Sequence, residues 1–245
     1  MKKCWCLLAI LVLGLLTTPV WAAAGGWKCE IAPYMWGVGI DGDITVKGTK
    51  VEVDVGVEDL IDKVDFAGGL LAVVQKGRWV NWLQVDYFEI SDDENVGKIE
   101  GSKVEVESDT LLLTVATGIQ VDGWKKGMTF DILGGLRYTR MDNELTISGN
   151  ASASGSRKTD IYDGVLVVRP SFQLSKRWRF NPTLSVGAGD SDLTYELQPQ
   201  FQFHFNDTWI ARLGYRRLYY DTEGSSGNKF DAAFHGFILG LGGTF

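Results

Sequence analysis

The sequence predicts an all-β protein, an antiparallel up-and-down transmembrane β-barrel with ten strands, or with eight if two weaker segments do not span. Three observations lead to this prediction. Apolar and polar residues alternate over long segments, polar links between these segments alternate in length, and the chain ends in an apolar stripe that finishes at Phe245. The composition agrees, because 30 glycines and 12% aromatic residues suit twisted sheets better than helices.

The first 24 residues have the pattern of a cleaved signal peptide. Lys2 and Lys3 give a positive start, the run 7–16 is apolar, and Ala22 to Ala24 are the small residues that a signal peptidase needs. The apolar run is shorter than the roughly 20 residues of a spanning helix. We therefore expect a signal peptide over 1–24 and one barrel domain over 25–245.

Alternation is clearest between Leu193 and Asn206, where odd positions carry mainly leucine and aromatic residues and even positions carry Thr, Glu, Gln and His. A soluble half-buried strand usually has about 5–6 residues, so this segment is long for an ordinary sandwich. The same reasoning along the chain predicts ten strands at 27–41, 64–76, 79–91, 104–121, 128–148, 160–174, 178–188, 192–206, 208–221 and 230–245.

The links between these strands differ in length. Tight polar links at 76–78, 122–127, 175–177 and 206–207 alternate with longer ones at 41–64, 91–103, 149–159 and 221–229, and one further short link lies near 187–191. A membrane barrel with short turns on the side of its termini and long loops on the other side produces this order. Ala151 to Ser156 are expected at the tip of one long loop.

The polar face of the strands indicates a lumen. It combines Gln, Thr, Ser and Gly with charges of both signs, which is too mixed and compact for a protein surface, whereas lipid requires the apolar face outside. Trp79, Trp82, Trp178 and Trp209 fit an aromatic ring at the membrane interface. The candidate lumen-lining residues are Arg137, Arg169, Arg179, Glu196, Arg212 and Arg216, with Asp86, Asp131 and Asp163 as further inward acids.

The last strand provides an assembly signal. Phe237, Leu239, Leu241 and the terminal Phe245 form one apolar stripe. This stripe resembles the terminal strand by which outer-membrane barrels are recognised by the barrel assembly machinery.

Short motifs extend this resemblance over most of the mature chain. They are Pro33-Tyr34-Met35-Trp36, Lys76-Gly77-Arg78-Trp79, Arg169-Pro170, Asn181-Pro182-Thr183-Leu184, the run from Gly187 to Thr194, and Gly214-Tyr215-Arg216 with Tyr219. The chain resembles small Gram-negative outer-membrane β-barrels of poorly defined function, a porin-like group. The resemblance implies location in the outer membrane, with contacts to its lipid and to lipopolysaccharide. It carries over no catalytic residue, and we expect a monomer.

Few residues point to other chemistry. The net charge of −7 argues against nucleic-acid binding, because no basic surplus neutralises phosphates. His204 is expected inside near the short-turn end and His235 outside near the opposite rim, and neither has a nucleophile in a suitable position. No His, Cys or carboxylate set has metal-ligand spacing. The sequence therefore predicts no enzyme activity, no metal site and no cofactor.

The state of the lumen decides between the functional hypotheses. A ten-stranded barrel is only slightly wider than an eight-stranded one, whose interior side chains fill. The inward arginines and acids either pair and close this space, or the arginines line one wall of a narrow water path. A narrow porin-like channel for small solutes is the first hypothesis. A non-conducting structural or surface-interaction barrel is the second, and a lipid-modifying enzyme is the third.

Overall fold

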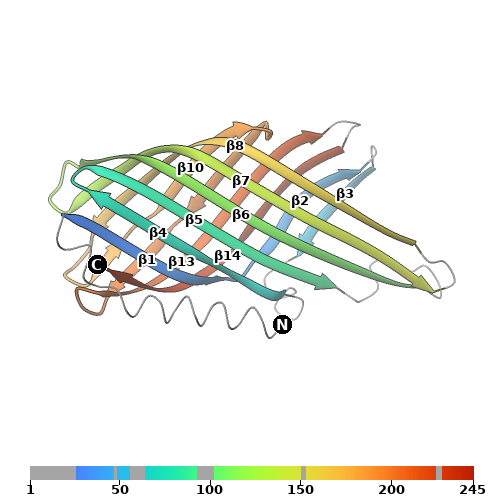
Figure 1. The fold of residues 1–245 in the computed structure, drawn as a ribbon, viewed down its shortest axis with the longest axis horizontal. Helices are drawn as coiled ribbons and strands as arrows, with labels where there is room; N and C mark the ends of the chain where they lie inside the picture. The colour runs from blue at the N-terminus through green and yellow to red at the C-terminus, as the bar shows by residue number, and fades with distance from the viewer. Residues whose placement is uncertain (1–25, 47–48, 56–63, 93–101, 150–152, 225–227) are drawn as a thin grey trace.

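The computed structural model describes residues 26–46, 49–55, 64–92, 102–149, 153–224 and 228–245. They form one closed antiparallel β-barrel whose strands are strongly tilted (Figure 1). The predicted fold class and the count of ten barrel strands are confirmed. The predicted signal peptide lies outside the described residues, and no helix among those described is long and apolar enough to cross a membrane.

Fourteen strand segments build the wall. They are β1 (Trp27–Trp36), β2 (Gly39–Val46), β3 (Thr49–Val55), β4 (Val64–Lys76), β5 (Trp79–Asp92), β6 (Ser102–Asp122), β7 (Met128–Gly149), β8 (Ala153–Gln173), β9 (Trp178–Phe180), β10 (Thr183–Gly189), β11 (Leu193–Gln198), β12 (Gln200–His204), β13 (Trp209–Gly224) and β14 (Asn228–Thr244). Consecutive barrel strands pair with each other, and among the described strands β3 pairs with β2 alone. The barrel closes where β1 pairs with β14, with Tyr34 opposite Gly240.

Three of the ten barrel strands are interrupted. Proline has no N–H for a ladder, and the breaks between β9 and β10 and between β11 and β12 fall at Pro182 and Pro199. The predicted strands 178–188 and 192–206 are therefore each two segments, although each crosses the wall as one strand. The predicted strand 27–41 is likewise broken at Gly37 and Val38, and β2 continues it along β14.

The two ends of the barrel differ as the links predict. Both described termini and the short turns lie at one end (Figure 1), where Gly77 adopts φ 58° between β4 and β5, a conformation that favours glycine. At the other end the strands are longer than predicted. β7 and β8 remain paired up to Ile147 and Ala153, so the expected loop over 149–159 is reduced to 150–152. Backbone pairing between β7 and β8 holds this projection together, and hydrogen bonds through the backbone give no periodic signal in the sequence.

On the exterior of the barrel, an apolar belt lies between two aromatic rings, that is, two girdles of tryptophan and tyrosine residues that encircle the barrel. Trp79, Trp178 and Trp209 are 52%, 47% and 38% exposed near the short turns. Tyr162 and Tyr195 are outward further along the strands, and each contacts another tyrosine ring. On β13, Trp209 belongs to the first group of aromatic residues and Tyr219 to the second. The segment 209–219 between them has the length of a membrane-spanning strand, roughly 9–11 residues.

Trp82 was expected in this interfacial ring, and that expectation is wrong. Its side chain is only 2% exposed and lies inside the barrel, on the same face of β5 as Gln84 and Asp86. The period of two along a strand requires this placement, because residues 82, 84 and 86 share one face.

The polar core of the barrel as a candidate functional site

The pleat of the long strands gathers polar side chains inside the barrel. Buried and exposed residues alternate along each strand, so one face of every strand points inward. Halfway along the barrel these faces bring together a set of hydrogen-bonded and ion-paired side chains, here termed the central network. Its members are Tyr34, Gln84, Asp86, Thr114, Arg137, Ser185, Thr194, Glu196 and Arg216.

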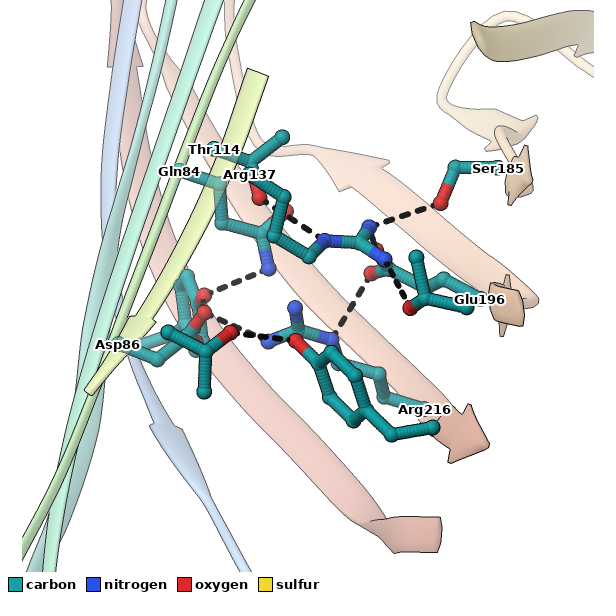
Figure 2. Close-up of polar contacts among 11 residues, drawn as sticks. Gln84, Asp86, Thr114, Arg137, Ser185, Glu196 and Arg216 are labelled. Atoms are coloured by element: carbon teal, nitrogen blue, oxygen red, sulfur yellow. Dashed lines mark hydrogen bonds and ion pairs between the residues drawn. The ribbon is translucent and has the colours of Figure 1, made fainter. Parts of the chain in front are cut away.

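Arg137 on β7 crosses the interior to β10 and β11. Its Nη2 donates to Glu196 Oε2 at 2.5 Å and to Ser185 Oγ at 2.8 Å, and its Nη1 donates to Thr194 Oγ1 at 3.1 Å (Figure 2). Its Nε donates to Thr114 Oγ1 at 3.3 Å. Arg137 is only 1% exposed, so these partners replace the water that the guanidinium loses on burial.

Arg216 on β13 joins the two carboxylates of the network. Its Nη1 lies 2.7 Å from Asp86 Oδ2 and its Nε lies 2.8 Å from Glu196 Oε1 (Figure 2). Its guanidinium carbon also lies 4.5 Å from the centre of the Trp36 ring, a cation–π geometry. Two arginines and two carboxylates therefore meet without excess charge.

Tyr34 completes the network from β1. Its hydroxyl donates to Asp86 Oδ1 and accepts a hydrogen bond of 2.8 Å from Gln84 Nε2. The ring fits because Gly69 stands beside it on β4, where an added Cβ would lie 2.5 Å from the ring. Glycine is therefore required at position 69 by the close approach of this side chain.

The other predicted lumen arginines lie nearer the short-turn end. Arg212 pairs with Glu30 and donates to Gln200 Oε1 at 3.0 Å. Arg169 pairs with Asp131 at 3.3 Å. Arg179 is only half-buried, and its Nη2 donates to the neutral Gln173 Oε1 at 2.9 Å.

Apolar side chains fill much of the remaining interior. On the long-loop side of the network, Phe88 packs edge-on against Trp36 at a ring distance of 5.7 Å, and its ring is tilted against that of Phe234 at 5.2 Å. Tyr220 contacts Phe234 and shares a hydrogen bond of 2.6 Å with Thr139. The interior is thus a packed core with a polar layer across it.

The remaining candidate residues lie away from this core. Phe237, Leu239 and Leu241 point outward with exposures of 65%, 61% and 50%, and the backbone of Phe245 exchanges two hydrogen bonds with Cys29. Their role in assembly stays a prediction. No group of His, Cys, Asp and Glu in the part of the chain that the structure describes is arranged to hold a metal ion.

Several polar side chains of the interior were absent from the sequence prediction. Tyr34 and Glu30 were missed because the segment 27–46 alternates less regularly than later strands. Thr114, Ser185 and Thr194 were missed because uncharged hydroxyl residues are common on any polar face. Parity was the available signal, since Glu30, Tyr34 and Trp36 share the inward face of β1.

Solved structures with similar folds agree with this architecture. The translocator domain of the autotransporter NalP from Neisseria meningitidis has a TM-score of 0.52 and 14% identity, and the alignment covers 100% of this chain and 95% of that chain. The outer membrane protease OmpT from Escherichia coli has a TM-score of 0.50 and 8% identity, with 89% and 96% covered. A major outer membrane protein from Thermus thermophilus has a TM-score of 0.42 and 15% identity, with 89% and 99% covered.

Identities this low establish the fold and not an activity. No family model matches the sequence, and no curated protein matches it. The fold is that of an outer-membrane β-barrel, as predicted, and the lipid-facing belt fits the predicted location in the Gram-negative outer membrane.

Proposed function

We propose that the protein is an integral outer-membrane barrel that does not conduct small solutes and acts as a structural or surface-interaction barrel. The central network carries this proposal. Asp86 on β5 and Arg216 on β13 are separated in the wall by β4, β1 and β14, yet their charged groups lie 2.7 Å apart. Side chains from opposite walls therefore meet in the middle of the lumen.

The charges of this layer favour closure over conduction. A narrow path for anions needs positive side chains along a hydrated wall. Arg137 and Arg216 are each 1% exposed, and each has a carboxylate partner. Of the two arrangements that the sequence leaves open, paired charges that fill the lumen agree better with these contacts than a basic wall does.

The long-loop end offers a surface for interaction. β7 continues for eleven residues beyond Tyr138 of the outer tyrosine ring, and β6 and β8 accompany it. Three hydrogen-bonded strands are enough to hold a sheet outside the membrane. Beyond Asp163, the other edge of β8 has no partner among the described strands, and such an edge can accept a strand from another protein.

The proposal assigns no catalysis to the two histidines. His235 Nδ1 lies 2.9 Å from the Tyr215 hydroxyl and its Nε2 lies 3.6 Å from Asp41 Oδ1, on the outer face of the barrel. His204 lies at the short-turn end. Neither has a serine or cysteine nucleophile among its described contacts, and the absence of enzyme activity stays a prediction.

Single-channel recording tests the proposal. The folded protein, verified by heat-modifiable migration on a gel, is inserted into planar bilayers. We expect no discrete openings from the wild type and none from Arg140→Ala, an exposed control on β7. A variant with Asp86, Arg137, Glu196 and Arg216 all changed to Ala should conduct if it folds. Wild-type openings whose anion preference falls in Arg212→Ala/Arg216→Ala would contradict the proposal and support the narrow channel.

A further inference from the structure

A pocket opens at the short-turn end of the barrel, separate from the central network. It has a volume of about 470 Å³, within the range of small-molecule sites. Its lining includes Lys176, Arg177, Arg179, His204 and Asp207, which come from two neighbouring turns and from the ends of β9 and β12. Three cations and one carboxylate leave a net charge of +2 on its walls.

This positive charge is not neutralised within the described part of the chain. Arg137, Arg169, Arg212 and Arg216 each have a carboxylate partner inside the barrel. No ion pair among the described residues includes Lys176, Arg177 or Arg179. Arg179 is half-buried, and Lys176 and Arg177 are exposed beside it. Since a half-buried guanidinium without a counter-charge is unfavourable and its two cationic neighbours repel it, the pocket is suited to an anion from outside the chain.

The walls of the pocket are already ordered by hydrogen bonds. The backbone N–H of His204 donates to the backbone carbonyl of Arg177 at 2.8 Å, and the Thr244 hydroxyl donates to the backbone carbonyl of Asp207 at 2.7 Å. Ser175 Oγ accepts a hydrogen bond of 3.1 Å from the backbone N–H of Trp178 and so fixes the turn that carries Lys176 and Arg177. Fixed turns reduce the entropy that the protein would lose on binding.

One polar atom at the pocket lacks a partner. His204 Nε2 is shielded from solvent and makes no hydrogen bond. An imidazole nitrogen can donate to an anion oxygen or accept from a protonated one. His204 lines the pocket, so a bound oxyanion would supply the counter-charge for the three cations next to its imidazole, and the ring would have to turn for Nε2 to reach the oxyanion.

We propose that this pocket binds a phosphate-bearing anion. A guanidinium presents a planar fork of donors that matches phosphate oxygens, and a lysine ammonium adds a point charge. Inorganic phosphate or a phosphate monoester carries nearly two negative charges at neutral pH, which balances the net charge of the walls, and the phosphodiester of a lipid headgroup carries one and balances it in part. Phe205 lines the pocket and is 52% exposed beside the tryptophan ring, so a phospholipid headgroup can reach it as well as a soluble phosphate.

The two histidines of the chain allow a direct test. The protein is folded in zwitterionic micelles with ¹³C-labelled histidine, and the two imidazole signals are assigned with His235→Gln. We expect inorganic phosphate, short-chain phosphatidylglycerol in the micelle, or both to shift the His204 signal saturably while His235 stays fixed. A response to phosphate alone identifies a soluble ligand, and a response to the lipid alone identifies a headgroup.

Matched variants decide whether the cations are responsible. Lys176→Gln/Arg179→Gln should weaken the binding at least about tenfold, the loss expected for charge-assisted hydrogen bonds. Lys125→Gln/Lys126→Gln, exposed in another turn at the same end, should bind as the wild type does. The proposal is overturned if His204 responds no more to either probe than to chloride at equal ionic strength, if both histidines shift alike, or if the two double variants bind equally.

Discussion

Arg137 on β7 and Glu196 on β11 form an ion pair of 2.5 Å in which both side chains are completely shielded from solvent, although β8 and β10 separate their strands in the wall. Such a pair is stable only if each charge keeps its partner, because a single buried charge loses its hydration without compensation. Glu196 also contacts Arg216, which in turn contacts Asp86. The energetic unit is therefore the set of four charges.

Removing one charge from this set should destabilise the barrel strongly. We expect Arg137→Gln and Glu196→Gln each to cost about 3–5 kcal/mol, because each leaves a buried charge in excess. The double variant restores balance between Asp86 and Arg216, so its cost should be smaller than the sum by at least about 1 kcal/mol. Urea unfolding in lipid vesicles, followed by gel migration of the folded form, measures the four free energies.

Arg140→Gln is the control for this cycle, since Arg140 pairs with Asp142 on the exposed side of β7. It should leave the stability of the barrel unchanged. Strictly additive effects of the Arg137 and Glu196 substitutions would show that the two charges do not act as a unit.

Gly69→Ala should disturb the same network without changing any charge. The added methyl group would lie 2.5 Å from the Tyr34 ring and 2.7 Å from the Val85 carbonyl oxygen. Tyr34 must then move away from Asp86, and we expect a loss of about 1–3 kcal/mol from this overpacking. Gly134→Ala is the matched control, because nothing lies within 4 Å of its added Cβ. Equal unfolding midpoints for the two variants would refute this account of Gly69.

The strands that contact lipid were predictable from the sequence, whereas the projection beyond them was not. Lipid requires continuous apolar residues on one face, so segments such as 193–206 and 209–219 carry an unmistakable period of two. The ends of β7 and β8 lie outside this requirement. Residues such as Ser154 and Ser156 pair through their backbones with Thr146 and Glu144, and their polar side chains gave no periodic signal.

The candidate site was predictable in its residue types but not in its pairs. Parity places Arg137, Glu196 and Arg216 on the inward face of their strands, and this is a local property of the chain. The pairs that these residues form depend on the height of each side chain along the barrel axis. This height is set by the tilt and stagger of the strands. Arg179 and Arg212 share the inward parity, yet Arg212 pairs with Glu30, whereas the hydrogen-bond partner of Arg179 among the described residues is the neutral Gln173.

A charge on the lipid-facing belt should be costly. Leu213 lies between Trp209 and Tyr219 on β13 and is 56% exposed on the outside. Leu213→Arg should lower the free energy of unfolding in vesicles by about 2–4 kcal/mol, the cost of an arginine near the bilayer midplane. Ser156→Arg, exposed on the projecting part of β8, should have no measurable effect. A similar small effect at both positions would argue against the membrane boundaries given by the two aromatic rings.

The projecting sheet should loosen in acid. Asp142 lies four residues beyond Tyr138. Partial burial raises the pKa of its carboxyl, but the hydrogen bond and charge of Arg140 and the charge of Lys158 lower this pKa by more. The net result is a pKa below the ordinary 3.8. A carboxyl whose pKa is lowered by folding stabilises the folded state when the pH is above its ordinary pKa. This stabilisation is lost as the pH falls from the ordinary pKa through the folded pKa. The protection factors of the amides near Asp142, taken relative to the intrinsic exchange rate at each pH, should therefore fall below about pH 4. Arg140→Gln/Lys158→Gln should remove this acid-dependent change, and an unchanged profile in that variant would show that the two cations do not hold the carboxylate.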